Sequence, residues 1–193
     1  MEVTIRAEGA RQVFTQLSAA KLPEFGQPPP SPEIIASVLS LGAADLETGE
    51  GAPRACSCGV PFLFVTVRDL DTLARARVNV EQWQRHLADY WASELYVITH
   101  GAGDADIRAR MFAPGMGIGE DAATGGAATA LAGYLHEPNA ADGTRRWTIR
   151  QGVEMGRPST IFLEADVAAG AINSIRVGGA SVLVSEGELT LPA

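Results

Sequence analysis

The residues best suited to chemistry lie in one glycine-rich segment, residues 117–126, which reads GIGEDAATGG. It follows a predicted strand and opens a predicted helix. Backbone amides at a helix start carry about half a positive charge, so those of Thr124, Gly125 and Gly126 could hold a carboxylate. Asp121 stands in the same turn, where a carboxylate partly shielded from water could move a proton beside that anion. The segment therefore predicts proton transfer on a small bound acid.

The same segment has other interpretations. Asp121 or Thr124 could simply cap the helix, with the glycines fitting a tight turn, and this alternative stays open. A dinucleotide site is excluded because Gly115, Gly117 and Gly119 do not follow the G-x-G-x-x-G spacing. A phosphate-binding loop is excluded because no Lys followed by Ser or Thr comes after the glycines.

The cysteines and histidines predict no second site. Cys56 and Cys58 are one residue apart, a separation that rarely allows a disulfide, and no further Cys or His cluster accompanies them. Buried free thiols are the favoured interpretation. None of His86, His100 and His136 has a metal-ligand partner four residues on, and no G-x-S-x-G elbow of a serine hydrolase is present.

Composition excludes several classes of partner. The 193 residues carry 15 basic and 23 acidic side chains, a net charge of −8, which argues against binding nucleic acid. No apolar run reaches the roughly 20 residues that a membrane span requires. The residues after Met1 also lack the basic and apolar regions of a secretory signal, so we expect a soluble, cytoplasmic protein.

Two features organise the N-terminal part. Residues 2–17 alternate as a β-hairpin with a turn at Glu8-Gly9. Five prolines between residues 21 and 32 predict an extended connector. A helix is then expected from the cap Ser31 to Gly42.

The rest of the chain predicts strands around one buried helix. Residues 127–135 are apolar on every side, and no charged residue lies between Asp121 and His136, so this helix must be surrounded by protein. The continuous apolar run of residues 60–67 indicates a strand covered on both faces. Further helices are expected at residues 69–75 and 80–91, and further strands at residues 95–98, 107–113, 146–150, 159–165, 172–177, 181–185 and 188–191.

Three blocks in this order resemble one family. They are RMFAP at residues 110–114, GIGEDAATG at residues 117–125 and QGVEMGRPS at residues 151–159. Together they are similar to the PhzF-like phenazine-biosynthesis isomerases, which share the diaminopimelate epimerase fold. The resemblance implies an α+β fold of two lobes, each a curved antiparallel or mixed sheet or barrel around a central buried helix. The active site would lie between the lobes, where the two helix starts face each other.

The resemblance also implies a site without cofactor or metal that acts on a small carboxylate-bearing molecule. Asp121 falls on the family's catalytic aspartate. The implied substrate-binding residues are Thr124, Gly125, Gly126, Gln151 and Gly152. The family's usual serine is replaced by Gly126, which removes a hydroxyl donor. The cysteine pair of the racemase relatives has no counterpart here, which disfavours amino-acid racemisation.

By this resemblance the domains would be a first-lobe hairpin (residues 1–20), the connector (21–32), the second lobe (33–177) and C-terminal strands that could return to the first lobe (178–193). The family's catalytic glutamate and a glycine-histidine block would lie before residue 1. Two functions stay open: an isomerase, or an incomplete relative that binds a small acid or a partner protein. An unfinished hairpin edge tends to recruit another strand, so we expect a homodimer or association with a chain that completes the first lobe.

Overall fold

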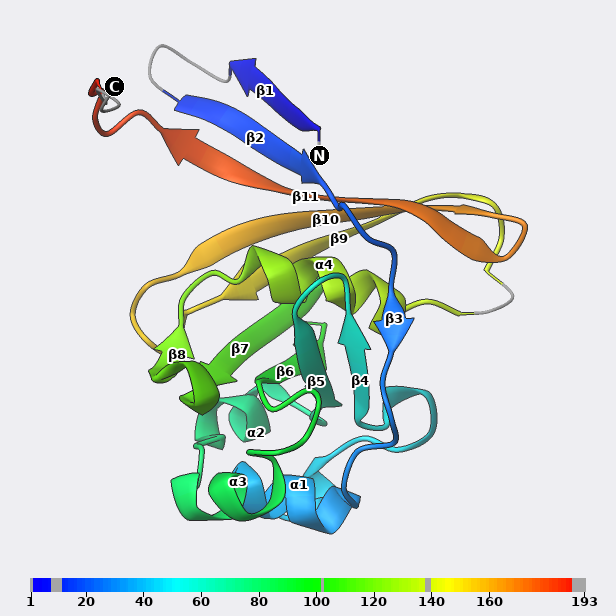
Figure 1. Ribbon diagram of the computed structural model, residues 1–193, viewed down its shortest axis with the longest axis vertical. Coiled ribbons are helices and arrows are strands. Elements are labelled where there is room, and N and C mark those ends of the chain that lie inside the picture. Colours follow the sequence, from blue (N-terminus) through cyan, green and yellow to red (C-terminus); the bar gives the residue numbers. More distant parts are fainter. Residues whose placement is uncertain (1, 8–11, 102, 138–139, 189–193) are drawn as a thin grey trace, which may run out of the picture.

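A buried helix, α4 (Gly125–Tyr134), packs against a strongly curved mixed sheet (Figure 1). The computed structural model describes residues 2–7, 12–101, 103–137 and 140–188. Every residue of α4 from Ala127 to Tyr134 is buried, and the helix contacts β4, β5, β10 and β11. The prediction of a central helix apolar on all sides is therefore confirmed.

The sheet is open. Its strand order is β1-β2-β11-β10-β9-β7-β6-β5-β4-β3, with β8 paired to β7 only. The β5–β6 and β7–β9 pairs are parallel and the other pairs are antiparallel. The predicted α+β fold is confirmed. Of the two predicted forms, a curved sheet or a barrel, the structure shows the open sheet. The strands are β1 (Val3–Ala7), β2 (Gln12–Ser18), β3 (Glu24–Phe25), β4 (Arg54–Ser57), β5 (Pro61–Thr66), β6 (Leu95–His100), β7 (Ile107–Ala113), β8 (Ile118–Asp121), β9 (Gly143–Gln151), β10 (Ser159–Ala168) and β11 (Ala171–Val182).

Two hydrophobic cores lie on opposite faces of the central strands. Along β5, Phe62 and Phe64 pack toward α4, whereas Leu63 and Val65 pack on the other face, as the alternation of a strand requires. That other face is covered by three helices, α1 (Pro32–Val38), α2 (Leu70–Arg75) and α3 (Val80–His86). The prediction of a strand buried on both faces is confirmed.

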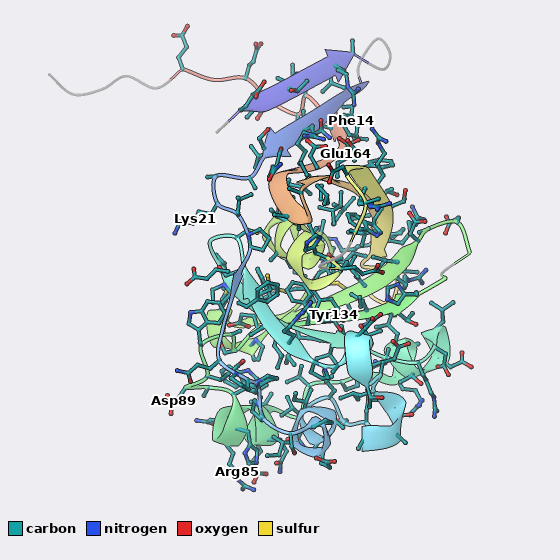
Figure 2. The ribbon with its side chains drawn as sticks, turned by 90° about the vertical axis from the view of Figure 1, so that its right-hand side faces the viewer. Phe14, Lys21, Arg85, Asp89, Tyr134 and Glu164 are labelled. Carbon is teal, nitrogen blue, oxygen red and sulfur yellow. The ribbon has the colours of Figure 1, made fainter. Side chains whose placement is uncertain are left out.

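The side view separates these layers (Figure 2). Phe14 on the hairpin strand β2 lies near Glu164, Tyr134 lies in the interior, and Arg85 of α3 lies with Asp89 toward the far end. None of the described helices has the length and apolar character needed to cross a membrane.

The N-terminal elements follow the prediction with one change. β1 and β2 form the expected antiparallel hairpin, whose predicted turn at Glu8-Gly9 lies outside the described residues. Helix α1 ends at Val38 and not near Gly42. Ser40 supplies the left-handed conformation (φ 57°), and the Leu41 N–H donates to the Ala36 C=O at 2.8 Å, which closes the helix early.

The expected helix at residues 80–91 also ends earlier, at His86. Within the predicted connector, Glu24–Phe25 form the short strand β3, which pairs with β4. The one-turn helix η3 (Pro114–Met116) joins β7 to β8; two others, η1 (Ala43–Asp45) and η2 (Gly49–Gly51), precede β4.

The two strands expected at residues 172–177 and 181–185 are one strand, β11, which ends at Val182. Gly178 and Gly179 lie inside β11 and not in a turn. A Cβ at Gly178 would lie 2.7 Å from the Thr15 carbonyl oxygen and 2.8 Å from the Phe14 ring, so this glycine permits close approach to β2. The strand expected at residues 188–191 falls almost entirely outside the described residues. The proposed division into lobes stays a prediction, although β11 runs without a break across residue 177.

Candidate active site

Asp121 is the last residue of β8 and lies shortly before the start of α4. Pro114 begins η3, and Gly117 (φ 71°) ends it, so the chain reverses and β8 pairs antiparallel with β7. Thr124 is then the N-cap residue of α4. The β7–η3–β8–α4 connection therefore brings the half-buried carboxylate of Asp121 next to a helix start.

Arg110 on β7 anchors the residue before Asp121. Its guanidinium donates to both carboxylate oxygens of Glu120, at 2.8 Å each, and its Nη1 donates to the carbonyls of Leu73 (3.0 Å) and Ala76 (2.8 Å) at the end of α2. Arg110 is buried. Successive residues of a strand point to opposite faces, so fixing Glu120 on this side directs Asp121 to the other.

Gln151, the last residue of β9, is fully buried beneath Asp121. Its Nε2 donates to the backbone carbonyl of Asp121 (2.8 Å) and to the Thr124 hydroxyl (2.9 Å). Its Oε1 accepts from the Thr124 backbone N–H (3.2 Å) and from the Tyr96 hydroxyl (3.0 Å). These four bonds use the whole hydrogen-bonding capacity of an amide side chain.

The Asp121 carboxylate is held by one side chain. The Thr124 hydroxyl donates to its Oδ2 at 2.7 Å, and no other described residue donates to this carboxylate. Thr124 makes no side-chain capping bond to α4. The structure therefore contradicts the interpretation of Asp121 and Thr124 as capping side chains. The Thr124 hydroxyl donates to the Asp121 carboxylate, and neither side chain accepts a hydrogen bond from an N–H group in the first turn of α4.

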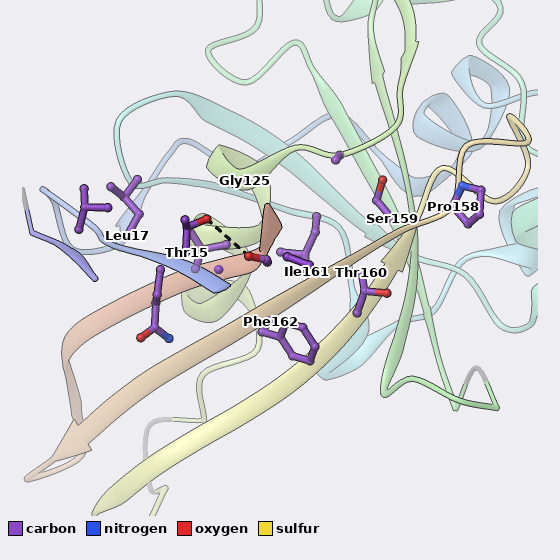
Figure 3. Close-up of a pocket in the computed structure, with 15 residues that line it drawn as sticks. Thr15, Leu17, Gly125, Pro158, Ser159, Thr160, Ile161 and Phe162 are labelled. Carbon is purple, nitrogen blue, oxygen red and sulfur yellow. Dashed lines mark hydrogen bonds between the residues drawn. The ribbon is translucent and has the colours of Figure 1, made fainter. Parts of the chain in front are cut away.

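A cleft of about 510 Å³ opens beside this carboxylate. Its lining residues are Asp121, Ala122, Ala123, Arg157, Pro158 and Ser159. A larger groove of about 690 Å³ shares Ala123, Pro158 and Ser159 with the cleft and reaches Gly125 at the start of α4 and the inner sides of β2, β10 and β11 (Figure 3). In this groove the Thr15 hydroxyl donates to the Gly179 carbonyl at 3.5 Å (Figure 3). The cleft at Asp121 and the groove at the start of α4 are therefore adjacent.

Gly152 supports the cleft from behind. It has a φ of 77°, and a Cβ there would lie 2.5 Å from the Arg157 carbonyl oxygen and 2.8 Å from that of Ala122. Only glycine lets the loop of residues 152–157 approach the backbone behind Asp121 this closely. The Arg108–Glu154 ion pair, at 3.2 Å, fixes the same loop to β7.

The predicted site residues thus divide into two groups. Asp121 lines the cleft and Gly125 lines the adjoining groove, while Thr124 and Gly126 lie beside Gly125 at the helix start; both glycines are exposed. The predicted substrate contact of Gln151 is corrected, because its buried amide has no capacity left for a ligand. The Thr124 N–H is likewise occupied by Gln151, which leaves the amides of Gly125 and Gly126 for an anion.

Sequence reasoning missed several residues of this site. Arg157, Pro158 and Ser159 stand in the third sequence block, so their position in a family motif was an available signal. No sequence signal pointed to Tyr96, because it lies in an apolar strand, as ordinary core residues do. Its place beneath Gln151 depends on the pairing of β6 with β7 and of β7 with β9.

The thiols stand apart from this site. Cys56 is buried and Cys58 partly buried, and both are free. Burial raises the pKa of Cys56 to about 12 and that of Cys58 to about 11, so neither is a ready thiolate. Within the described ranges, no three His, Cys, Asp or Glu side chains come together as a metal site.

Comparison with known proteins agrees with this fold. The family model described as phenazine biosynthesis-like protein matches residues 2–187. The chain belongs to this family. It is 34% identical over 193 residues to an uncharacterised isomerase of Mesorhizobium japonicum, a match that covers 95% of this chain and 62% of that protein. It is also 40% identical over 84 residues to the trans-2,3-dihydro-3-hydroxyanthranilate isomerase of Pseudomonas chlororaphis, covering 44% of this chain and 30% of that enzyme.

Solved structures of the family have the same fold. A Bacillus anthracis phenazine biosynthesis protein of the PhzF family superposes with a TM-score of 0.80 at 21% identity. A Pseudomonas aeruginosa protein described as a predicted epimerase superposes with a TM-score of 0.71 at 30% identity. Each match covers 98% of this chain and 64% of the solved chain. The chain therefore spans less than two thirds of the length of these relatives.

Proposed function

We propose that this chain supplies the aspartate side of an isomerase site, which moves a proton on a small carboxylate-bearing substrate without a cofactor. The observation that carries the proposal is the state of Asp121: Oδ2 is held by the Thr124 hydroxyl, while Oδ1 has no donor among the described residues and the side chain lines the cleft. A half-buried carboxylate with one oxygen free is placed to accept and return a proton.

The start of α4 is the proposed binding site for the substrate carboxylate. The first N–H groups of a helix have no partner within it, and here the first intrahelical bond runs from the Ala128 N–H to the Thr124 carbonyl. Gly125 lines the groove beside the cleft of Asp121, and both Gly125 and Gly126 are exposed. Arg157, which lines the cleft, adds a positive charge that favours an anion.

The proposed isomerisation removes a proton at one position of the substrate and returns it at another. Asp121 is the only carboxylate lining the cleft in the described part of the chain. A second proton-carrying group, if the reaction needs one, would come from a segment outside these residues or from another chain. The relatives named as isomerases support this class of reaction, and the name of the Pseudomonas chlororaphis enzyme suggests cyclic, unsaturated amino carboxylates as substrates.

Proton exchange in D2O tests this proposal. The purified chain is incubated with small dienoic acids and with amino carboxylates, and deuterium uptake is followed by NMR. We expect uptake into one of these acids, and a loss of about 100-fold or more in Asp121→Asn. Glu81→Gln, on the exposed face of α3, is the control and should exchange like the parent. Uptake that persists in Asp121→Asn, or no uptake with any acid, would contradict catalysis by this chain.

The edge of the sheet favours a second function, association with another chain. β1 is an edge strand whose residues are all exposed, Val3 by 54% and Ile5 by 66%. The Ser18 N–H donates to the Glu2 carbonyl at 2.9 Å, so Thr4 and Arg6 occupy the hydrogen-bonded pairs with β2. The N–H and C=O groups of Val3 and Ile5 therefore point outward. We propose that they pair with a strand of a second copy or of a chain that completes the lobe.

A further inference from the structure

We propose that Tyr96 and Gln151 are positioning residues, which hold the Thr124 hydroxyl against Oδ2 of Asp121 and so assign the transferred proton to Oδ1. This inference rests on the proposed function of Asp121. It concerns a chain of buried hydrogen bonds that starts on β6, passes through the end of β9 and ends at the carboxylate. Neither Tyr96 nor Gln151 reaches the cleft.

The backbone fixes the direction of every bond in this chain. The N–H of Thr124 can only donate and the C=O of Asp121 can only accept, so the amide of Gln151 must place Oε1 on the first and Nε2 on the second. A flipped amide would set donor against donor and acceptor against acceptor. The second Nε2 proton therefore goes to the Thr124 hydroxyl oxygen, at 2.9 Å.

The fixed orientation of the Gln151 amide also determines the donor and acceptor roles of the Thr124 and Tyr96 hydroxyls. Since the Thr124 oxygen accepts from Gln151, its own proton is free to be donated to Asp121 Oδ2, at 2.7 Å. The Tyr96 hydroxyl meets the acceptor Oε1 at 3.0 Å and must donate to it. The chain thus runs one way, from the Tyr96 hydroxyl to the amide, to the Thr124 hydroxyl and to the carboxylate.

Burial makes this arrangement rigid. Tyr96 and Gln151 are both fully buried, so an unmade bond could not be replaced by bulk water and would leave a polar group without a partner. The Tyr96 ring packs edge-on against Phe64, with centroids 5.7 Å apart. Burial, and to a smaller extent the charge of Asp121, raise the pKa of Tyr96, so its hydroxyl keeps the proton that it donates.

The consequence for chemistry is that the two oxygens of Asp121 are not equivalent. Oδ2 already faces a donated proton, so a proton taken from the substrate must reside on Oδ1, the oxygen left free for the cleft. The charged groups near Asp121 make no bond that distinguishes its two oxygens. Glu120 is paired with Arg110, and Arg157 lines the cleft without an ion pair in the described residues. The hydrogen-bonded chain alone distinguishes the two oxygens.

Two matched pairs of variants test the inference. Tyr96→Phe removes the first donor, and Tyr134→Phe is its control, because Tyr134 also packs on Phe64 (5.2 Å) and also loses a buried hydroxyl bond, to Thr66 at 2.8 Å. Among the described residues, no hydrogen bond joins Tyr134 to Gln151. Thr124→Val removes the last donor while keeping the backbone N–H, and Thr124→Ser keeps the hydroxyl.

The first readout does not depend on activity. The Asp121 side chain of the full chain should occupy one rotamer by its Hβ coupling constants, and the Gln151 side-chain N–H protons should exchange slowly with solvent. We expect Thr124→Val to average the Asp121 rotamers and Tyr96→Phe to speed exchange of the Gln151 protons. Thr124→Ser and Tyr134→Phe should leave both as in the parent. A single Asp121 rotamer in Thr124→Val would overturn the inference.

The second readout is proton exchange on the acid identified in D2O. Tyr96→Phe should lower kcat about tenfold and Thr124→Val by at least as much, both with little change in KM, whereas Thr124→Ser should retain kcat. Equal losses in Tyr96→Phe and Tyr134→Phe would reduce Tyr96 to a structural role and overturn the inference. If the parent chain shows no exchange at all, the proposed function fails, and the NMR comparison still decides whether the chain positions Asp121.

Discussion

The guanidinium of Arg110 holds both oxygens of Glu120 at 2.8 Å, directly beside the carboxylate that lines the cleft. Two adjacent acids thus have different roles. Glu120 is used to fix β8 against β7 and the end of α2, and Asp121 is left with one free oxygen. The sequence Glu-Asp alone gives no indication of which acid is which; the buried cation on the neighbouring strand decides it.

This pair predicts a large effect on stability. Arg110→Met should lower the free energy of unfolding by about 3–5 kcal/mol, because it leaves the carboxylate of Glu120 without its partner and removes one of the donors to the Leu73 and Ala76 carbonyls at the end of α2. Chemical denaturation measures the change. The double variant Arg110→Met with Glu120→Gln should recover part of the loss, since no uncompensated charge remains. A double variant less stable than Arg110→Met would contradict the pairing.

A second prediction concerns the loop behind Asp121. Gly152→Ala should destabilise the chain by about 3 kcal/mol or more, because its left-handed φ and its contacts with two backbone oxygens both oppose a side chain. Gly156 is the matched control in the same loop, with a φ of 72° and nothing within 4 Å of an added Cβ. Gly156→Ala should cost only about 1–2 kcal/mol, measured by the same denaturation. Equal losses would show that the close approach behind Asp121 is not what requires Gly152.

The helix start offers a gain of function. A Cβ at Gly126 would meet only Phe62, at 3.8 and 3.9 Å, which is ordinary contact, so Gly126→Ser should fold normally. The added hydroxyl should strengthen binding of a small carboxylate, for which 3-hydroxyanthranilate is a stable probe, by about threefold to tenfold. Calorimetry measures the Kd, and Gly126→Ala fills the same space without a donor. Unchanged affinity in Gly126→Ser, or an equal gain in Gly126→Ala, would argue against an anion site here.

A pH-dependent contribution to stability comes from β10 and β11. The guanidinium of Arg176 lowers the pKa of Asp166 from 3.8 to about 2, with a second bond from Thr144. The folded state therefore favours the ionised form, and this stabilisation is present above about pH 4 and is lost as pH falls toward 2. The Asp166 side chain is 36% exposed, so solvent screening limits the effect to about 1 kcal/mol.

Asp166→Asn tests this contribution. The variant should be less stable than the parent at pH 7, and the difference should shrink between pH 4 and pH 2, as measured by thermal unfolding across this range. Glu81→Gln, in the exposed pair with Arg85, serves as a comparison that should show little difference at any pH. A deficit in Asp166→Asn that is constant with pH would contradict the linkage.

Local sequence was sufficient for those features that local physics determines. The all-apolar residues 127–135 predicted a buried helix, and the run of residues 60–67 predicted a strand covered on both faces. Each depends on residue type and spacing within one segment.

The features that failed depend on contacts between distant segments. Gly178 and Gly179 have the pattern of a turn, yet they lie in β11 because β2, far away in the chain, approaches there. Gln151 had the place of a substrate contact in a motif, but its amide is used by Thr124, 27 residues earlier. The helix expected to reach Gly42 ends at Val38, where the carbonyls of Val38 and Leu39 accept from the N–H groups of Asn79 and Arg77, far along the chain.

The exposed edge of β1 gives the last prediction. Ile5→Pro removes an N–H that points away from β2, so the hairpin itself should remain paired while the edge can no longer accept a full partner strand. If copies associate through this edge, the parent chain should be a dimer in size-exclusion chromatography with light scattering, and Ile5→Pro a monomer. Ile5→Thr keeps both the N–H and the β-branched shape and should remain dimeric. A parent chain that is monomeric at every concentration tested would exclude self-pairing and leave only a different chain as the partner of this edge.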